Sequence, residues 1–338
     1  MGPTDTSADH EKAVEDYVSS LSTPSMAMDH SRPLWELHVL NFPTAEATAT
    51  VALRMHHSLG DGISLLSLLI ACTRRADDPG ALPALPSSGR RRAHAGPVYA
   101  LPRPPLAPCS GRVAPFGEEG ARRFVNRTLS LGDVKHVKNA MGCTVNDVLV
   151  GVSSAALSRY YFRRTGTGQN DESGKNNGVK CGNQFGYVIL PFHLAKHGDP
   201  LEYVRKATKV TCRKKSSMES IFTYWSADMI VKIFGIKAAA SLCYGMFSNT
   251  TLSFSNLAGP SEQIVFCGNP IVHIAPTSYG HSHALTMHWQ SYMHIVKLAL
   301  AVDETQFPDA HELLDDFTES LRLIREAASR DTEKAHLE

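Results

Sequence analysis

Residues 56–62 read His-His-Ser-Leu-Gly-Asp-Gly and separate two segments with different hydrophobic patterns. The segment before them, Thr48 to His56, alternates along its length, which predicts a half-buried β-strand. The segment after them, Ile63 to Cys72, is apolar and predicts a short helix. A strand, a glycine-containing turn and a helix therefore follow one another here. Such an edge is where proteins commonly present functional side chains.

The paired histidines point to chemistry at this turn. A histidine titrates near neutral pH without help and can act as a general base toward a hydroxyl group. Adjacent side chains on a strand point to opposite faces, so we expect His56 and His57 to have different roles, one structural and one chemical. Residue types alone leave three interpretations open: buried structural histidines, a general base, or a metal site. The opposed side chains argue against the metal site.

Asp61 is expected to fix the geometry of the turn. It stands directly before Gly62 and the apolar helix, which predicts an N-cap whose carboxylate is stabilised by the helix dipole. Pairing with an arginine is the alternative role. In neither role does Asp61 need to touch a substrate, and in both it would help to aim His57.

The rest of the chain has the mixed pattern of an α/β protein. Helices are predicted at 11–21, 145–162 and 310–328, the second of them after the capping-box pattern Thr144-x-x-Asp147. Strands are predicted at 34–40, 123–129, 186–191, 250–255, 271–276, 284–290 and 294–303.

Residues 76–120 interrupt this pattern. They hold nine of the chain's 19 prolines together with the cluster Arg90-Arg91-Arg92, a composition typical of a linker without regular elements. We therefore expect an N-terminal domain at 1–75, a linker at 76–120 and a C-terminal domain at 121–338. The arginines are interpreted as a solvated part of the linker, with contact to anionic lipid as the alternative.

Composition limits the partners of the protein. Its formal net charge is +1, from 34 basic and 33 acidic residues, so the chain lacks the positive field that nucleic-acid binding usually requires. Its seven cysteines are odd in number and include no Cys-x-x-Cys pair, which predicts free thiols and no zinc site. The N-terminus resembles no secretory signal, so we expect the protein to meet membranes from the cytosolic side.

One segment, Ile221 to Phe247, is apolar enough to suggest contact with lipid. Asp228, Lys232 and Lys237 interrupt it, whereas a span needs about 20 nearly uncharged residues. Buried helices are the main interpretation and an interfacial helix is the second. A membrane span is the least favoured.

Four motifs in this order resemble one family. Residues 56–62 match the HHxxxDG motif of the chloramphenicol-acetyltransferase-like and condensation-domain superfamily. Within it, the plant wax ester synthase/diacylglycerol acyltransferase family also shares Pro33-Leu34-Trp35-Glu36, Asn146-Asp147 and 255–260, which reads Ser-Asn-Leu-Ala-Gly-Pro. The resemblance covers residues 16 to about 329, outside the linker. It implies an α/β fold with two chloramphenicol-acetyltransferase-like domains, mixed sheets and a substrate tunnel between them, with the first domain N-terminally truncated.

The resemblance also implies roles for residues. His57 is the implied general base and His56 its support, while Asp61 and Gly62 are structural. Supporting positions at the substrate site are implied at Pro33, Leu34, Trp35, Asn146, Asp147, Ser255 and Gly259. Asn146 and Asp147 could instead serve only the start of their helix, where Asp147 can close the capping box. Asn256 could donate its amide to an oxyanion or serve only the following turn.

The implied activity is transfer of a fatty acyl group from acyl-CoA to a long-chain alcohol, giving a wax ester, or to diacylglycerol, giving triacylglycerol. The expected place is the cytosolic face of the endoplasmic reticulum membrane, by peripheral attachment, with the plasma membrane or a lipid droplet as other surfaces. No metal and no cofactor is expected, and no nucleic acid. Two alternatives remain: a catalytically weak lipid-binding or scaffold homologue, and a superfamily transferase acting on a soluble alcohol or amine.

Overall fold

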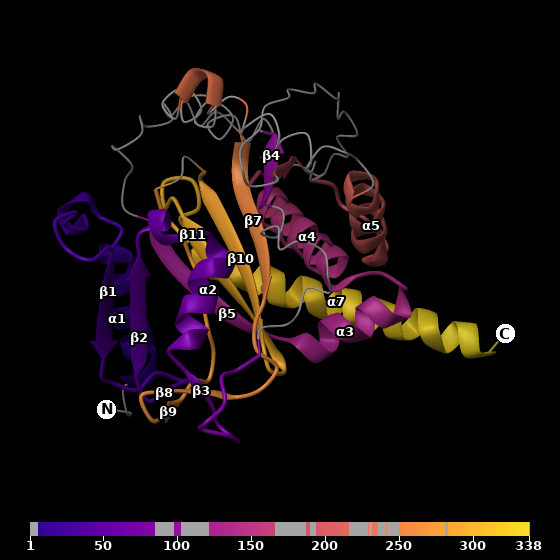
Figure 1. Cartoon of the computed structure of the whole chain (residues 1–338). Coiled ribbons are helices and arrows are strands. Elements are labelled where there is room, and N and C mark those ends of the chain that lie inside the picture. Colours follow the sequence, from indigo (N-terminus) through magenta and orange to yellow (C-terminus); the bar gives the residue numbers. More distant parts are fainter. Residues whose placement is uncertain are drawn as a thin grey trace, which may run out of the picture.

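The computed structural model describes residues 6–84, 98–102, 122–165, 187–189, 194–215, 229, 232–235, 241, 250–280 and 283–337. A six-stranded mixed sheet lies at the centre of these residues (Figure 1). Strands β10 and β7 are parallel, as are β4 and β6, and the other neighbours are antiparallel. In spatial order the strands are β5 (Arg123–Ser130), β11 (Ile295–Val302), β10 (Leu285–Tyr292), β7 (Thr250–Ala258), β4 (Val98–Pro102) and β6 (Tyr187–Ile189).

One face of this sheet is apolar and is covered by helices. In Figure 1, α7 crosses behind the strands, and buried side chains of β10 and β11 pack there against α3, α4 and α7. Trp289 on β10 meets Phe317 on α7 edge to face, with ring centroids 5.7 Å apart. Helix α5 joins this layer by packing on α4. The helices are α3 (Leu131–Ala140), α4 (Val145–Thr165), α5 (Leu201–Lys215) and α7 (Ala310–Leu337).

The opposite face of the sheet is more polar and faces the N-terminal segment. Pairing across the strands aligns Ser255 with His288, Gln290 with Lys297, and Lys297 with Thr128, so these side chains share one face. The segment on this side contains α1 (Thr6–Ser20), the antiparallel pair β1 (Trp35–Leu40) and β2 (Thr50–Met55), the 3-10 turns η1 (Pro24–Met26) and η2 (His57–Leu59), and α2 (Gly62–Ala71). A small sheet consists of β3 (Arg74–Arg75), β8 (Ile264–Phe266) and β9 (Asn269–Pro270). It joins the C-terminal end of the N-terminal segment to the rest of the protein.

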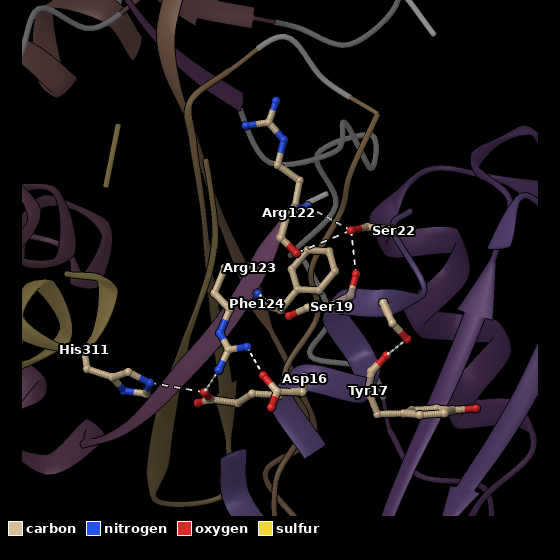
Figure 2. Close-up of polar contacts among 10 residues, drawn as sticks. Asp16, Tyr17, Ser19, Ser22, Arg122, Arg123, Phe124 and His311 are labelled. Carbon is tan, nitrogen blue, oxygen red and sulfur yellow. Dashed lines mark hydrogen bonds and ion pairs between the residues drawn. The ribbon is translucent and has the colours of Figure 1, made fainter. Parts of the chain in front are cut away.

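Polar contacts attach α1 to β5 (Figure 2). The Arg123 guanidinium pairs with Asp16 and, at 3.1 Å, with Glu15. The backbone amide of Phe124 donates to Ser19 Oγ at 3.0 Å, and that of Arg122 donates to Ser22 Oγ at 2.9 Å. The N-terminal segment is therefore held on the first strand of the sheet by both charged and neutral hydrogen bonds.

A second attachment lies in the loop between β1 and β2. Lys297 is only 2% exposed, and its ammonium donates to Glu46 at 2.5 Å and to Thr128 Oγ1 at 2.8 Å. Glu46 also lies 3.0 Å from His273 Nδ1. Hydrogen bonds from His273, Lys297 and Thr128 hold the pKa of the Glu46 carboxyl well below its usual range, although partial burial opposes them. Burial lowers the pKa of Lys297, which the bond to Glu46 partly offsets.

Most of the predicted elements are present, with ends shifted by up to nine residues. The predicted helices at 11–21, 63–72, 145–162 and 310–328 correspond to α1, α2, α4 and α7. Of the predicted strands, those at 34–40, 48–56, 123–129, 186–191, 250–255, 284–290 and 294–303 correspond to β1, β2, β5, β6, β7, β10 and β11. The α/β class with mixed sheets is confirmed.

The predicted strand at 271–276 was wrong, because this segment has no ladder partner among the described residues. Side chains and single backbone bonds hold it instead. The Tyr292 hydroxyl donates to the carbonyl of Ile271 at 2.9 Å, and the Ile271 amide donates to the carbonyl of Ile264 at 2.9 Å. A short apolar segment held by such isolated bonds can have the same composition as a strand, so the sequence alone does not distinguish the two.

The linker prediction was wrong at Val98–Pro102, which forms β4 between β7 and β6. Four residues without a break, Val-Tyr-Ala-Leu, are enough for a short strand, and the register shifts where Pro102 ends it. The arginine cluster at 90–92 lies outside the described residues. Most of Ile221 to Phe247 does as well.

In strand β1 the apolar side is more exposed than the polar side. Its apolar side chains Trp35, Leu37 and Val39 are 54%, 43% and 61% exposed, whereas Glu36 and His38 are less exposed. Glu36 pairs with the buried Arg54 at 3.0 Å, and the Tyr17 hydroxyl lies 2.9 Å from His38 Nδ1. These polar contacts orient the strand in this structure.

Within the described residues, no single helix is long and apolar enough to cross a membrane. Helices α3 and α4, bent by 104° at the break between them, would together pass as a broken span by length and composition only.

Candidate active site

The turn that carries the two histidines begins directly after β2. The His56 amide donates to the carbonyl of Leu34 at 2.9 Å, which continues the pairing of β1 with β2 by one residue. His56 has an extended backbone, and His57 opens the single 3-10 turn η2. The predicted end of the strand at His56 is confirmed within one residue, but the opposed side chains expected from strand alternation do not follow, because His57 lies in a 3-10 turn. His57 is exposed, at the place where the strand ends and the turn begins.

His56 stabilises the turn. Its Nδ1 accepts from the Ser58 amide at 3.2 Å and lies 2.7 Å from Ser58 Oγ. Its ring also meets that of His30 edge to face, with centroids 5.4 Å apart. These contacts suit the supporting role expected of His56.

Asp61 caps α2, as the sequence predicts. Its Oδ1 accepts from the Ser64 amide at 2.8 Å. Gly60, just before it, lies against the same helix turn, because a β-carbon there would come within 2.8 Å of Ser64 Cβ. A larger residue at Gly60 would push η2 away from α2, so the glycine and the cap together fix the path of the chain after His57.

Two contacts place this turn on the polar face of the sheet. At the start of α2, a β-carbon on Gly62 would lie 3.6 Å from Leu257 Cδ1, so Gly62 approaches the end of β7. Just before the turn, Arg54 Nε donates to the Tyr279 hydroxyl at 2.7 Å. The chain segment that carries the histidines is therefore anchored both before the turn, by Arg54, and after it, at Gly62.

The Ser255-to-Pro260 motif ends β7 at this place. Ser255 and Leu257 alternate onto the face that meets α2, and Ser255 Oγ lies 2.5 Å from His288 Nδ1. Asn256 is aligned with Trp289, whose side chain packs among the helices. The proposed contact between the Asn256 amide and an oxyanion stays a prediction, and the strand register does not favour it.

Gly259 is required by a close approach between backbones. A β-carbon there would lie 2.3 Å from the carbonyl oxygen of Ser291 and 2.5 Å from Gln290 Nε2. The Gly259 amide donates to the same Ser291 carbonyl at 3.0 Å. Any other residue would separate the end of β7 from β10.

The remaining motif residues fall into two groups. Pro33, Leu34 and Trp35 lie beside the histidines, because β1 pairs with β2 and Trp35 stands opposite Met55. Asp147, which is 1% exposed, lies at the start of α4 in the helical layer.

Asp147 closes the predicted capping box. The Thr144 amide donates to Asp147 Oδ2 at 2.9 Å, and the Asp147 amide lies 3.3 Å from Thr144 Oγ1. The Thr211 hydroxyl on α5 also donates to Asp147. These bonds give Asp147 a structural role, and a substrate contact for Asn146 or Asp147 stays a prediction.

Three polar residues on this side of the sheet, Arg54, Ser278 and His288, were not predicted from the sequence. Only His288 had a sign in the sequence, because Thr286, His288 and Gln290 put a polar residue at every second position of the buried strand β10. Among the described residues, no group of three or more His, Cys, Asp or Glu side chains is arranged to hold a metal ion.

Comparisons with known proteins identify the family. The wax ester synthase/diacylglycerol acyltransferase catalytic domain matches residues 10–100, and the C-terminal domain of the same family matches residues 181–325. Wax ester synthase/diacylglycerol acyltransferase 11 of Arabidopsis thaliana is 39% identical over 94% of this chain and 77% of its own length. Number 4 from the same plant is 38% identical over 94% of this chain and 73% of its own length.

A solved structure shares the fold. The wax ester synthase/diacylglycerol acyltransferase from Marinobacter aquaeolei VT8 superposes with a TM-score of 0.65 at 21% identity, covering 94% of this chain and 76% of its own. The chain belongs to the wax ester synthase/diacylglycerol acyltransferase family and is an acyltransferase.

Proposed function

We propose that this acyltransferase moves a fatty acyl group from acyl-CoA to a long-chain alcohol or to diacylglycerol, with His57 as the general base. The observation that carries the proposal is the placement of His57. It is exposed on a short turn that is fixed before and after it, by the pairing of β2 with β1 and by the Asp61 cap. A base held in this way can meet a hydroxyl group without reorganising the chain.

In the proposed reaction the acyl group passes directly from CoA to the acceptor, without an acyl-enzyme intermediate. The acceptor oxygen forms a bond to the thioester carbonyl carbon while an imidazole nitrogen of His57 takes the hydroxyl proton. The carbonyl electron pair moves to its oxygen, and when the double bond re-forms the CoA thiolate leaves with that proton. Atoms and electrons balance without a metal or a cofactor.

The test compares the two histidines. We expect His57→Ala to lower turnover of labelled palmitoyl-CoA with hexadecanol or diacylglycerol by about 10²- to 10⁴-fold, the usual loss with a general base. His56→Ala is the matched control and should lower turnover only in part. Both variants should be checked for folding by circular dichroism. A His57→Ala enzyme that retains more than a few per cent of activity places the base elsewhere.

The absence of a metal or cofactor requirement is part of the proposal. We expect chelators to leave turnover unchanged and the purified protein to contain no stoichiometric zinc. Metal analysis that finds one zinc ion per chain would contradict this.

We also propose peripheral attachment to the cytosolic face of the endoplasmic reticulum membrane, with 221–247 as the contact. Within that segment Met229, Ile233 and Phe234 are 57%, 62% and 69% exposed, which supports contact with lipid. Alkaline carbonate should release the protein from a membrane fraction. Retention in the pellet would indicate a span, and absence from membranes would indicate buried helices.

A further inference from the structure

A histidine between two serines lies on the polar face of the sheet. His288 Nδ1 lies 2.5 Å from Ser255 Oγ, and His288 Nε2 lies 3.1 Å from Ser278 Oγ. The three residues come from different parts of the chain: β7, β10 and the loop before β10. All three residues are half-buried.

The cluster lies beside the histidine turn by two independent contacts. Leu257, which follows Ser255 on the same face of β7, approaches Gly62. Tyr279, the neighbour of Ser278, accepts the hydrogen bond from Arg54. Gly62 and Arg54 stand on the two sides of His57 in the sequence, five and three residues away. The chain path therefore brings the cluster and His57 to one region of the protein.

The hydrogen bonds of the ring constrain the hydroxyl protons. A neutral imidazole has one N–H donor and one acceptor nitrogen. In the tautomer with its proton on Nδ1, His288 donates to Ser255 Oγ and accepts from the Ser278 hydroxyl. The Ser255 O–H is then directed away from the ring and can donate to another group. A serine hydroxyl can donate or accept, so the Nδ1–H tautomer, in which Ser278 donates to Nε2, is part of the proposal that follows.

We propose that His288 is a positioning residue that directs the Ser255 hydroxyl toward the oxyanion formed during acyl transfer. The inference rests on the proposed function, in which the acyl carbonyl oxygen becomes negatively charged beside His57. Ser255 keeps its proton throughout and forms no covalent bond to the acyl group. It only donates a hydrogen bond, which strengthens as charge develops on the oxygen.

Kinetics with palmitoyl-CoA and hexadecanol test the proposal. We expect Ser255→Ala to lower kcat by about 10²- to 10³-fold with little change in KM, as for the loss of an oxyanion donor. His288→Ala should lower kcat on the order of 10- to 100-fold, as for residues that orient an active group. His288→Asn keeps an N–H donor near the position of Nδ1 and should recover part of that loss.

Non-additivity separates positioning from a general structural effect. The double variant Ser255→Ala/His288→Ala should lose no more activity than Ser255→Ala alone, because His288 acts through that hydroxyl. Ser253→Ala is the matched control, two residues earlier on the same face of β7, and should retain kcat. Additive losses, an unchanged kcat in Ser255→Ala, or an equal loss in Ser253→Ala would overturn the proposal.

Histidine NMR and fluorophosphonate labelling test the proposal independently of the role of His57. Nitrogen NMR of histidine-labelled protein should show His288 as the Nδ1–H tautomer, and its resonances should move in Ser255→Ala. Resonances that do not move, or the opposite tautomer, would refute the proposal whether or not transfer is observed. An active His57→Ala enzyme would contradict the proposed base without touching these resonances. Labelling of Ser255 by a fluorophosphonate would make it a covalent nucleophile and overturn the positioning role.

Discussion

The two faces of the central sheet differ in polarity and in the kind of contact they make. The face toward α3, α4 and α7 is apolar and closely packed, with Trp289 and Phe317 among its buried side chains. The face toward the N-terminal segment carries Lys297 and His288, which are bound by hydrogen bonds. The first face supplies most of the hydrophobic stabilisation, and the second holds the β1–β2 loop, Ser255 and Ser278 by hydrogen bonds. Stability and catalysis should therefore respond to mutations on different faces.

The largest stability effect is expected on the apolar face. Phe317→Ala removes a fully buried ring that packs against Trp289, and should lower the free energy of unfolding by about 3–5 kcal/mol. Urea denaturation measures it. A loss below 1 kcal/mol would show that this face does not dominate stability.

On the polar face, the two members of one ion pair should differ in cost. Glu46→Gln leaves the ammonium of Lys297 buried at 2% exposure without its carboxylate, whereas Lys297→Met leaves Glu46, which is 40% exposed, beside His273 and solvent. We expect Glu46→Gln to be the more destabilising variant. Its cost should stay below the 3–5 kcal/mol of a fully buried pair, because Glu46 is partly solvated. Urea denaturation of both variants would contradict this if Lys297→Met lost more.

The same pair predicts a pH dependence. The pKa of Glu46 is lowered in the folded protein, so its ionisation stabilises the fold above the unfolded-state pKa of about 4.3. That contribution is lost as the pH falls through the lower, folded-state pKa. The stability difference between the wild-type protein and Glu46→Gln should therefore be constant near neutral pH and shrink below about pH 4. Thermal denaturation across this range checks the slope, and a difference that grows on acidification would contradict it.

The smallest effect is expected at the helix cap. Asp61→Ala removes one hydrogen bond to the Ser64 amide and should cost about 1 kcal/mol, together with a loss of turnover because the turn is less well fixed. Asp61→Asn keeps the capping acceptor and should restore most of the stability. Lost turnover with unchanged thermal stability in Asp61→Ala would instead give Asp61 a direct catalytic role.

The sequence predicts the strand, turn and helix around 56–62 because each has a local pattern: alternation in β2, a capping aspartate and an apolar helix. It also predicts the capping box of α4, which depends on residues three apart. The cluster around His288 could not be predicted in the same way. Ser255 and His288 are 33 residues apart, and only the parallel pairing of β7 with β10 brings them together.

Strand β1 shows a second limit of local patterns. Alternation predicts two different sides for the strand but does not say which side is covered. Here Arg54 and Tyr17 bind Glu36 and His38, and the apolar side stays exposed. The outcome depends on partners outside the strand, which a periodicity argument does not contain.

The attachment of the N-terminal segment to β5 and β11 has a consequence for how the protein is made. The strand that carries Lys297, β11, begins at Ile295, about 240 residues after His57. At about 5–20 residues per second, the loop between β1 and β2 waits roughly 10–50 s for the strand that binds Glu46. For most of this interval the apolar helix α2 is also without its final contact at β7. The segment that carries His57 is thus synthesised well before the strands on which it is finally placed.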